Sequence, residues 1–146
     1  MPTLILIIFI IGIDQLSKFY IQSVLALGKS VPVLADIFHI TYILNPGAAF
    51  GILEHQRLLF IVVATALLLG VLCFQNRLKK EPLRMRLGVA LLSGGAMGNL
   101  VDRIRLGAVV DFFDFRIWPI FNVADIAIVL GVGLIVWAAF LTTKEE

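Results

Sequence analysis

Two short sequences combine an asparagine and an aspartate at the same spacing and could do chemistry together. Asn99 and Asp102 lie in "GNLVDRI", and Asn122 and Asp125 lie in "FNVAD", so the pattern Asn-x-x-Asp occurs twice. A spacing of three places each asparagine on the same helix face as its aspartate. Two carboxylates that face one another in a partly dry site share a proton, so that one activates water while the other polarises a carbonyl group. This is the chemistry of an aspartic protease.

Other polar residues near these patterns allow more than one interpretation. Asp14 precedes Lys18 by four residues, which permits either an ion pair within one helix or a contact to a substrate. Arg103 follows Asp102 directly and either extends to the lipid headgroups or acts near the site. The two carboxylates could also join helices or line an ion or proton pathway. Spacing alone leaves these alternatives open.

The composition is that of an integral membrane protein. Hydrophobic residues make up 60% of the 146 residues and charged residues only 15%, with a mean hydropathy of +1.02. A soluble domain is about 45–50% apolar and about 25% charged. The net charge of +2 is too small to indicate a nucleic-acid partner. A single cysteine, Cys73, excludes an internal disulfide framework and a multi-cysteine metal cluster, and we expect no metal and no cofactor.

Four windows are apolar over the roughly 20 residues that a helix needs to cross a bilayer. They cover residues 3–22, 58–75, 87–104 and 120–141. We therefore expect one domain over residues 1–146, an all-α membrane protein built as a four-transmembrane-helix bundle. The first window lacks a basic region before its apolar run, so we do not expect a removable signal peptide. Gly94 and Gly98, four residues apart in the third window, predict a close helix contact.

The short connection 76–86 predicts the orientation of the bundle. It carries five lysine and arginine residues and one glutamate, a density typical of cytoplasmic loops. Both termini are then cytoplasmic, and the longer connections 23–57 and 105–119 lie on the outer side. The third span runs outward and the fourth inward, which brings Asp102 and Asp125 to a similar depth near the outer leaflet.

The outer connections carry patterns of their own. Residues 37–44, "IFHITYIL", alternate as a strand does, and "NPGAAFG" at 45–51 is typical of a turn. We expect a small extracytoplasmic β element within residues 28–57. In "VVDFFDFRIWP" at 109–119, aromatic residues alternate with charged ones, which favours a segment lying among the lipid headgroups.

Several spaced motifs in one order strongly resemble the lipoprotein signal peptidase family, also called signal peptidase II. They are "DQLSK" at 14–18, "NPGAAFG" at 45–51, "GGAMGNLVDR" at 94–103, "VVDFFDF" at 109–115 and "FNVADIAI" at 121–128. The resemblance covers essentially the whole chain. It implies a small sheet on the outer membrane face, in agreement with the strand pattern above.

The resemblance also implies a function and a set of site residues. The family's members are intramembrane aspartic endopeptidases that cut prolipoproteins before a cysteine bearing a diacylglyceryl group. Carried onto this chain, the catalytic pair is Asp102 and Asp125. The substrate-site positions are Asp14, Asn45, Asn99, Arg103 and Asn122. The expected partners are prolipoproteins and membrane lipids. We expect a monomer in the bacterial cytoplasmic (inner) membrane, with its active site near the outer leaflet.

Two other classes of function compete with this interpretation. A small ion or proton transporter would use Asp14, Asp102 and Asp125 as a relay, although the cytoplasmic half of the predicted bundle has almost no ionisable residues. A purely structural bundle subunit would need the three aspartates only for assembly. The sequence does not indicate which aspartate of the pair begins as the base.

Overall fold

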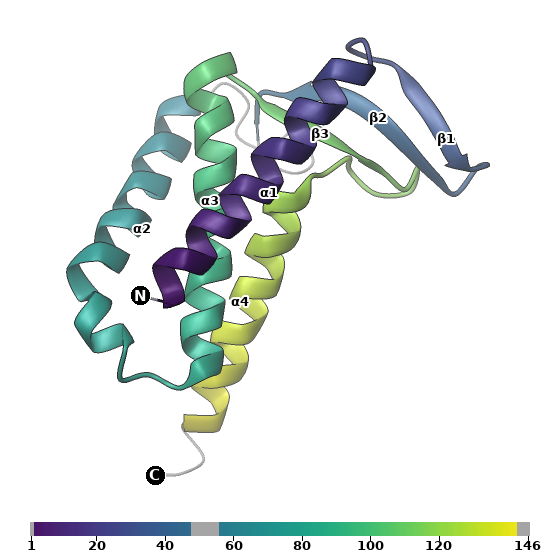
Figure 1. Ribbon diagram of the computed structural model, residues 1–146. Coiled ribbons are helices and arrows are strands. Elements are labelled where there is room, and N and C mark those ends of the chain that lie inside the picture. The colour runs from purple at the N-terminus through teal and green to yellow at the C-terminus, as the bar shows by residue number, and fades with distance from the viewer. Residues whose placement is uncertain (1, 48–55, 143–146) are drawn as a thin grey trace.

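The fold consists of four long helices and a small sheet at one end of them (Figure 1). The computed structural model describes residues 2–47 and 56–142. The helices are α1 (Pro2–Val24), α2 (Arg57–Leu78), α3 (Leu83–Leu106) and α4 (Val123–Thr142). The strands are β1 (Ser30–Leu34), β2 (Phe38–Asn45) and β3 (Val109–Asp114). All four predicted helices therefore form, each within a few residues of its expected bounds.

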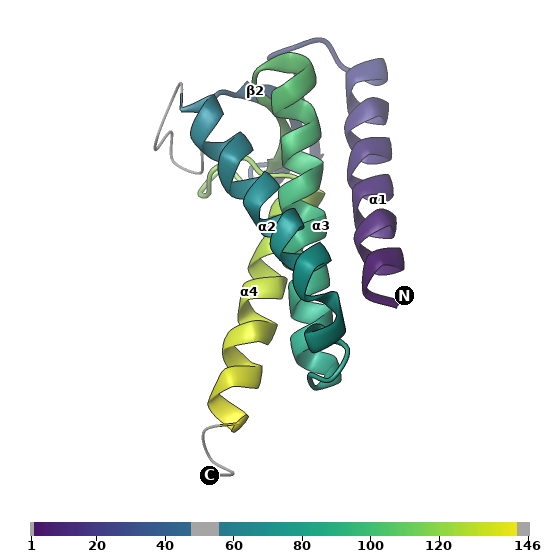
Figure 2. The ribbon, with the colours of Figure 1, turned by 90° about the vertical axis from the view of Figure 1, so that its left-hand side faces the viewer.

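Helix α3 is the central element of the bundle and packs against each of the other three helices (Figure 2). Glycines allow this packing, because a Cβ atom at these positions would overlap a neighbouring helix. A Cβ at Gly94 would lie 2.8 Å from Ile10 of α1, and one at Gly98 would lie 2.5 Å from the Asp14 carboxylate. The predicted close contact at Gly94 and Gly98 is confirmed, and its partner is α1.

Three of the helices are long and apolar enough to cross a membrane. They are Thr3–Val24, Arg57–Leu78 and Val123–Leu141. Large apolar side chains such as Ile8, Phe19 and Val129 are exposed on them, as expected for surfaces that face lipid. Helix α3 is less apolar, because it carries glycines and polar residues that face the other helices rather than lipid. Three of the four predicted spans thus have the length and apolar composition of membrane-crossing helices.

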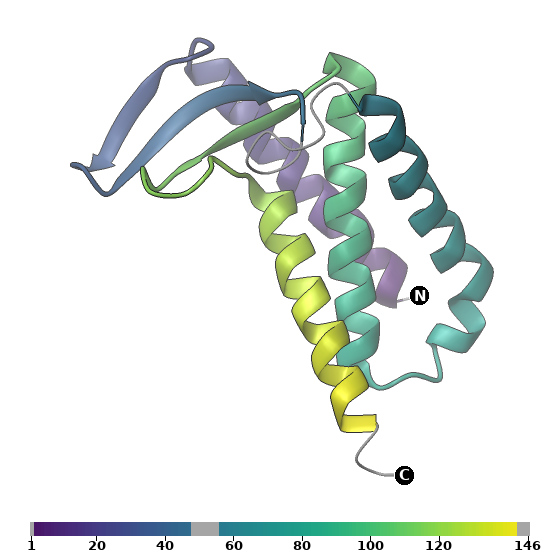
Figure 3. The same cartoon turned by 180° about the vertical axis from the view of Figure 1, so that it is seen from behind.

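The sheet is antiparallel with the strand order β1-β2-β3. The strand predicted at 37–44 is confirmed as β2, and β1 lies within the predicted β region 28–57. The predicted turn at 45–51 lies outside the described residues beyond Gly47. Figure 3 shows the sheet extending sideways from the bundle, on the side away from both chain termini.

Strand β3 corrects the expectation for residues 109–119. The first six of these residues are a sheet strand, and five of the six are buried. Val110 and Phe112 pack with Ile21 of α1, which attaches the sheet to the bundle. Because both faces of β3 are covered, its sequence lacks the apolar–polar alternation that identifies a half-buried strand. Only residues 115–118, which include the 95% exposed Ile117, remain at the surface as expected.

Candidate active site

The second Asn-x-x-Asp pattern caps the start of α4. The Asp125 backbone N–H donates to the Asn122 side-chain oxygen (3.0 Å), and the Asn122 N–H donates to the Asp125 carboxylate (3.1 Å). This reciprocal arrangement is a capping box, which satisfies backbone donors that the first turn of a helix leaves free. The cap fixes the Asp125 carboxylate at the end of α4 that adjoins the sheet.

Asn99 of α3 connects this cap to the helix bundle. Its Nδ2 donates to Asp125 Oδ1 at 2.8 Å, so both oxygens of the Asp125 carboxylate accept a hydrogen bond. Its Oδ1 accepts hydrogen bonds from Asn122 Nδ2 (3.1 Å) and from Lys18 Nζ (2.8 Å). Asn99 therefore orients the Asp125 carboxylate from the α3 side.

The first pattern has a different environment, because Asp102 points toward α1. Asp102 is 2% exposed and forms an ion pair with Lys18 (2.9 Å). It also accepts hydrogen bonds from Gln15 Nε2 (2.9 Å) and from the Val110 N–H (3.1 Å). At the level of Asp102 the neighbours of α3 are α1 and the start of β3. The structure thus differs from the expectation that Asp102 faces Asp125.

Asp14 belongs to the same buried cluster as Asp102. Lys18 lies between the two carboxylates and contacts Asp14 at 2.8 Å, so the predicted pair within one helix forms. The other Asp14 oxygen accepts the Ala124 N–H of α4 at 3.0 Å. Asp14 and Lys18 are 0% and 1% exposed. A buried cation between two carboxylates holds α1, α3 and α4 together, since each charge has a partner.

The carboxylate that accompanies Asp125 is Asp111, in the middle of β3. Its two oxygens accept hydrogen bonds from Asn122 Nδ2 (2.6 Å) and Asn45 Nδ2 (2.9 Å). Burial and then the nearby Asp125 charge raise the pKa of Asp111 from 3.8 to about 7, although both amide donors oppose that change. Asp111 therefore holds its proton to a pH at which an ordinary aspartate is ionised.

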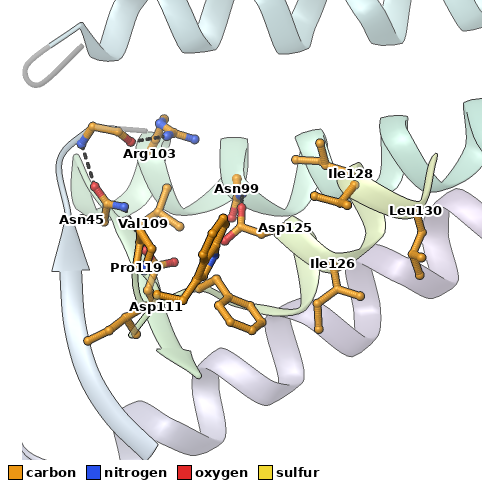
Figure 4. Close-up of a pocket in the computed structure, with 15 residues that line it drawn as sticks. Asn45, Asn99, Arg103, Val109, Asp111, Pro119, Asp125, Ile126, Ile128 and Leu130 are labelled. Atoms are coloured by element: carbon orange, nitrogen blue, oxygen red, sulfur yellow. Dashed lines mark hydrogen bonds between the residues drawn. The ribbon is translucent and has the colours of Figure 1, made fainter. Parts of the chain in front are cut away.

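Both carboxylates line one pocket of about 510 Å³ between the sheet and α4 (Figure 4). Its polar part is formed by five side chains from β2, α3, β3 and α4: Asn45, Asn99, Arg103, Asp111 and Asp125. Its apolar part continues along α4 and the segment before it, and includes Phe121, Ile126, Ile128, Val129 and Leu130. A few polar groups at the end of an apolar pocket are typical of a site that binds an amphipathic ligand.

Arg103 lines the pocket rather than extending away from it. Its Nη2 donates to the Gly47 carbonyl at 2.8 Å, and its guanidinium lies 4.2 Å from the centre of the Phe60 ring. Gly47 in turn donates its N–H to the Asn45 side chain at 3.0 Å. Arg103 thus connects α3 and α2 to the end of β2, and provides the positive charge beside the two carboxylates.

The structure divides the residues expected at the site into two groups. Asn45, Asn99, Arg103 and Asp125 line the pocket. Asp14, Asp102 and Asn122 lie behind it and hold the first group in place. The sequence interpretation missed Asp111, although it lies within the quoted motif "VVDFFDF". The signal that could have found it is a lone aspartate among apolar residues next to a predicted site.

Fold and site together define a multi-pass membrane protein with a pair of carboxylates in a pocket at one end of its helices. Residues 6–141 match the family model described as signal peptidase (SPase) II. The chain therefore belongs to the signal peptidase II family, and this makes it a protease.

Related proteins agree with this assignment over nearly their whole lengths. The chain is 44% identical over 146 residues to a lipoprotein signal peptidase of Moorella thermoacetica, covering 100% of this chain and 97% of that one. It is 46% identical to one of Pelotomaculum thermopropionicum, covering 92% and 88%. A solved bacterial membrane enzyme superposes with a TM-score of 0.88 at 33% identity, covering 99% of this chain and 91% of the other.

Proposed function

We propose that the protein is an aspartic endopeptidase whose catalytic pair is Asp111 and Asp125. The observation that carries this proposal is that both carboxylates line the same pocket, whereas Asp102 is buried in an ion pair outside it. Asp111 thus takes the role that the sequence pattern suggested for Asp102. Asp125 keeps the role expected for it.

The two carboxylates differ in their surroundings, and this favours different roles. The raised pKa of Asp111, about 7, favours its protonated form, which can donate a hydrogen bond to the carbonyl oxygen of the scissile bond. Asp125 accepts hydrogen bonds from the Asn99 side chain and from the Asn122 backbone N–H, which fix the orientation of its carboxylate at the pocket. Asp125 is then the base that removes a proton from the attacking water. The Asp111 proton passes to the carbonyl oxygen as the tetrahedral intermediate forms.

The apolar part of the pocket supports a lipid-modified substrate. Ile126, Val129 and Leu130 of α4 are 40%, 70% and 55% exposed, on a helix apolar enough to cross a membrane. Acyl chains of a diacylglyceryl-cysteine can therefore lie along α4 in the bilayer, while the peptide bond before that cysteine reaches the two carboxylates. The substrate we propose is a prolipoprotein, which loses its signal peptide at this bond.

We further propose that all four helices span the bacterial inner membrane. Helix α3 has 24 residues and is therefore about 36 Å long, enough to cross the hydrocarbon core. The basic connection between α2 and α3 favours a cytoplasmic position for that end and for both termini. The pocket then lies near the outer leaflet.

A proton relay has less support. Among the described residues, the fully buried polar side chains of the helices gather at the end nearer the sheet, apart from Ser93. Lys18 also pairs with both Asp14 and Asp102, which leaves those carboxylates no free site for a transported ion.

The direct test is cleavage of a diacylglyceryl-modified prolipoprotein by the purified protein in liposomes. The same prolipoprotein without the lipid is the matched substrate control. We expect cleavage of the modified form only, and a loss of about 10²–10⁴-fold in Asp125→Asn, the usual contribution of a general base. Near-normal cleavage by a folded Asp125→Asn variant would refute the proposed mechanism.

A further inference from the structure

A second, apolar groove lies at the end of the bundle away from the sheet. It is formed by the start of α3 and the end of α4, with Leu83 and Leu87 on one side and Leu134 and Trp137 on the other. Leu83 and Trp137 are 65% and 57% exposed. The pocket with Asp111 and Asp125 is lined by the end of α3 and the start of α4, so it lies at the opposite end of the same two helices. The groove is therefore separate from the site described above.

The end of the bundle that carries this groove is rich in positive charge. The connection between α2 and α3 and the first turn of α3 carry Arg77, Lys79, Lys80, Arg84 and Arg86, against the single Glu81. Within residues 2–47 and 56–142, none of these five cations has an ion-pair partner. Among the same residues, Arg84 and Arg86 each have a buried Nε atom without a hydrogen-bond acceptor. The apolar groove thus lies at an end of the bundle whose cations have no counter-charges among the described residues.

Arg84 is the cation that lines the groove itself. Its guanidinium lies 6.0 Å from the centre of the Trp137 ring, so that side chain is held over α4. The first turn of α3 contains no acidic residue and its N-cap, Pro82, provides no side-chain hydrogen bond. Basic residues near a helix N-terminus are unfavourable next to the positive end of the helix dipole. An anion beside Arg84 would offset both effects.

We propose that this groove binds one anionic phospholipid of the membrane leaflet at that end of the bundle. The phosphate contacts the Arg84 guanidinium, and an acyl chain lies against Leu83, Leu87 and Leu134. Charge complementarity favours an anionic headgroup over a zwitterionic one, and the apolar floor favours a lipid over a free anion. A bound lipid would fix the depth of α3 and α4 in the bilayer, and with it the depth of the catalytic pocket.

Trp137 provides a local probe for this lipid. The chain has two tryptophans, so Trp118→Phe leaves Trp137 as the sole tryptophan, whose fluorescence can be excited separately from that of the two tyrosines. This variant is placed in liposomes that contain either brominated phosphatidylglycerol or brominated phosphatidylcholine, because bromine quenches a tryptophan that it contacts. We expect stronger quenching by the anionic lipid. Adding Arg84→Gln should lower the preference for the anionic lipid about five-fold, because it removes the direct contact between the guanidinium and the phosphate.

Arg77→Gln is the matched control. It removes the same charge at the same end of the bundle, but Arg77 stacks on Phe74 of α2 and does not line the groove. The control should keep the lipid preference of the parent. Equal losses in both variants would show a diffuse charge effect and overturn the proposal, as would displacement of the brominated lipid by inorganic phosphate alone. Arg84→Met, which keeps the apolar stem, provides the same comparison if Arg84→Gln does not fold.

Discussion

The two Asn-x-x-Asp patterns have the same spacing but do different things in the fold. In the pattern at 122–125, the asparagine and aspartate bond to each other's backbone and start α4. In the pattern at 99–102, which lies inside α3, the two side chains share Lys18 but otherwise have different partners. Asn99 also bonds to Asp125, whereas Asp102 bonds to Gln15. One aspartate therefore lines the pocket and the other is buried behind it.

This difference shows that the neighbouring elements, and not the spacing alone, determine the role of each carboxylate. Helix α4 begins beside Asn99, while β3 begins beside Asp102 and donates the Val110 N–H to it. The strand then continues for one residue and places Asp111 in the pocket. The site consequently takes one carboxylate from a helix start and the other from a strand.

The largest effect, on the stability of the bundle, is expected from Lys18→Met, which removes the cation that pairs with Asp102 of the first pattern. This change leaves Asp14 and Asp102 buried without their cation, and breaking a buried pair costs about 3–5 kcal/mol. We expect a lower midpoint of thermal unfolding in detergent. Lys79→Met removes an exposed lysine whose side chain bonds, within residues 2–47 and 56–142, only to Asn76, and its midpoint should match the parent. Equal midpoints for the two variants would show that the buried cluster does not stabilise the bundle.

The second prediction concerns pH and the proton on Asp111. Because burial and Asp125 raise the pKa of Asp111 to about 7, its protonated form predominates below that pH. If this form donates the catalytic proton, kcat/KM should fall about ten-fold for each pH unit above 7. The same fall of kcat/KM above pH 7 should persist in Asp102→Asn, because Asp102 lies outside the pocket. A flat profile to pH 9 would contradict the role of Asp111.

A smaller effect is expected from Asn122→Ser. A serine oxygen can still accept the Asp125 N–H, so the cap of α4 remains. The shorter side chain loses the 2.6 Å hydrogen bond to Asp111, which normally lowers the pKa of that carboxyl. The alkaline limb of the kcat/KM profile should therefore move to higher pH, with about 1 kcal/mol less stability from the lost hydrogen bond. Movement to lower pH would contradict the assigned contact.

The helices were predictable because each shows a long apolar run, and strand β2 because it alternates. The expected windows 87–104 and 120–141 became α3 (83–106) and α4 (123–142). Strand β3 was not predictable in the same way. It is buried on both faces, so it does not alternate, and Asp111 interrupts its apolar residues. Its pairing partner β2 lies more than sixty residues earlier, so only the folded sheet brings Asn45 to Asp111.

The sequence placed Asp125 at the site because the start of a predicted span gives an expected depth in the membrane. The same reasoning gave Asp102 a similar expected depth, but depth does not fix the direction in which a side chain points around the helix. Three residues along α3 rotate the side chain by about 300°, so Asn99 and Asp102 differ by about 60°. Both side chains contact Lys18, but that rotation lets Asn99 also bond to Asp125 of α4, whereas Asp102 bonds to Gln15 of α1.

The central claim is that Asp125 acts with Asp111 and not with Asp102. The most direct measurement compares Asp111→Asn with Asp102→Asn, the same chemical change nine residues apart, as the cleavage rate per folded molecule. Asp102→Asn leaves Lys18 paired with Asp14, so we expect its rate to stay within about ten-fold of the parent. Asp111→Asn should lose about 10²–10⁴-fold. Retained cleavage in Asp111→Asn together with its loss in Asp102→Asn would contradict the account.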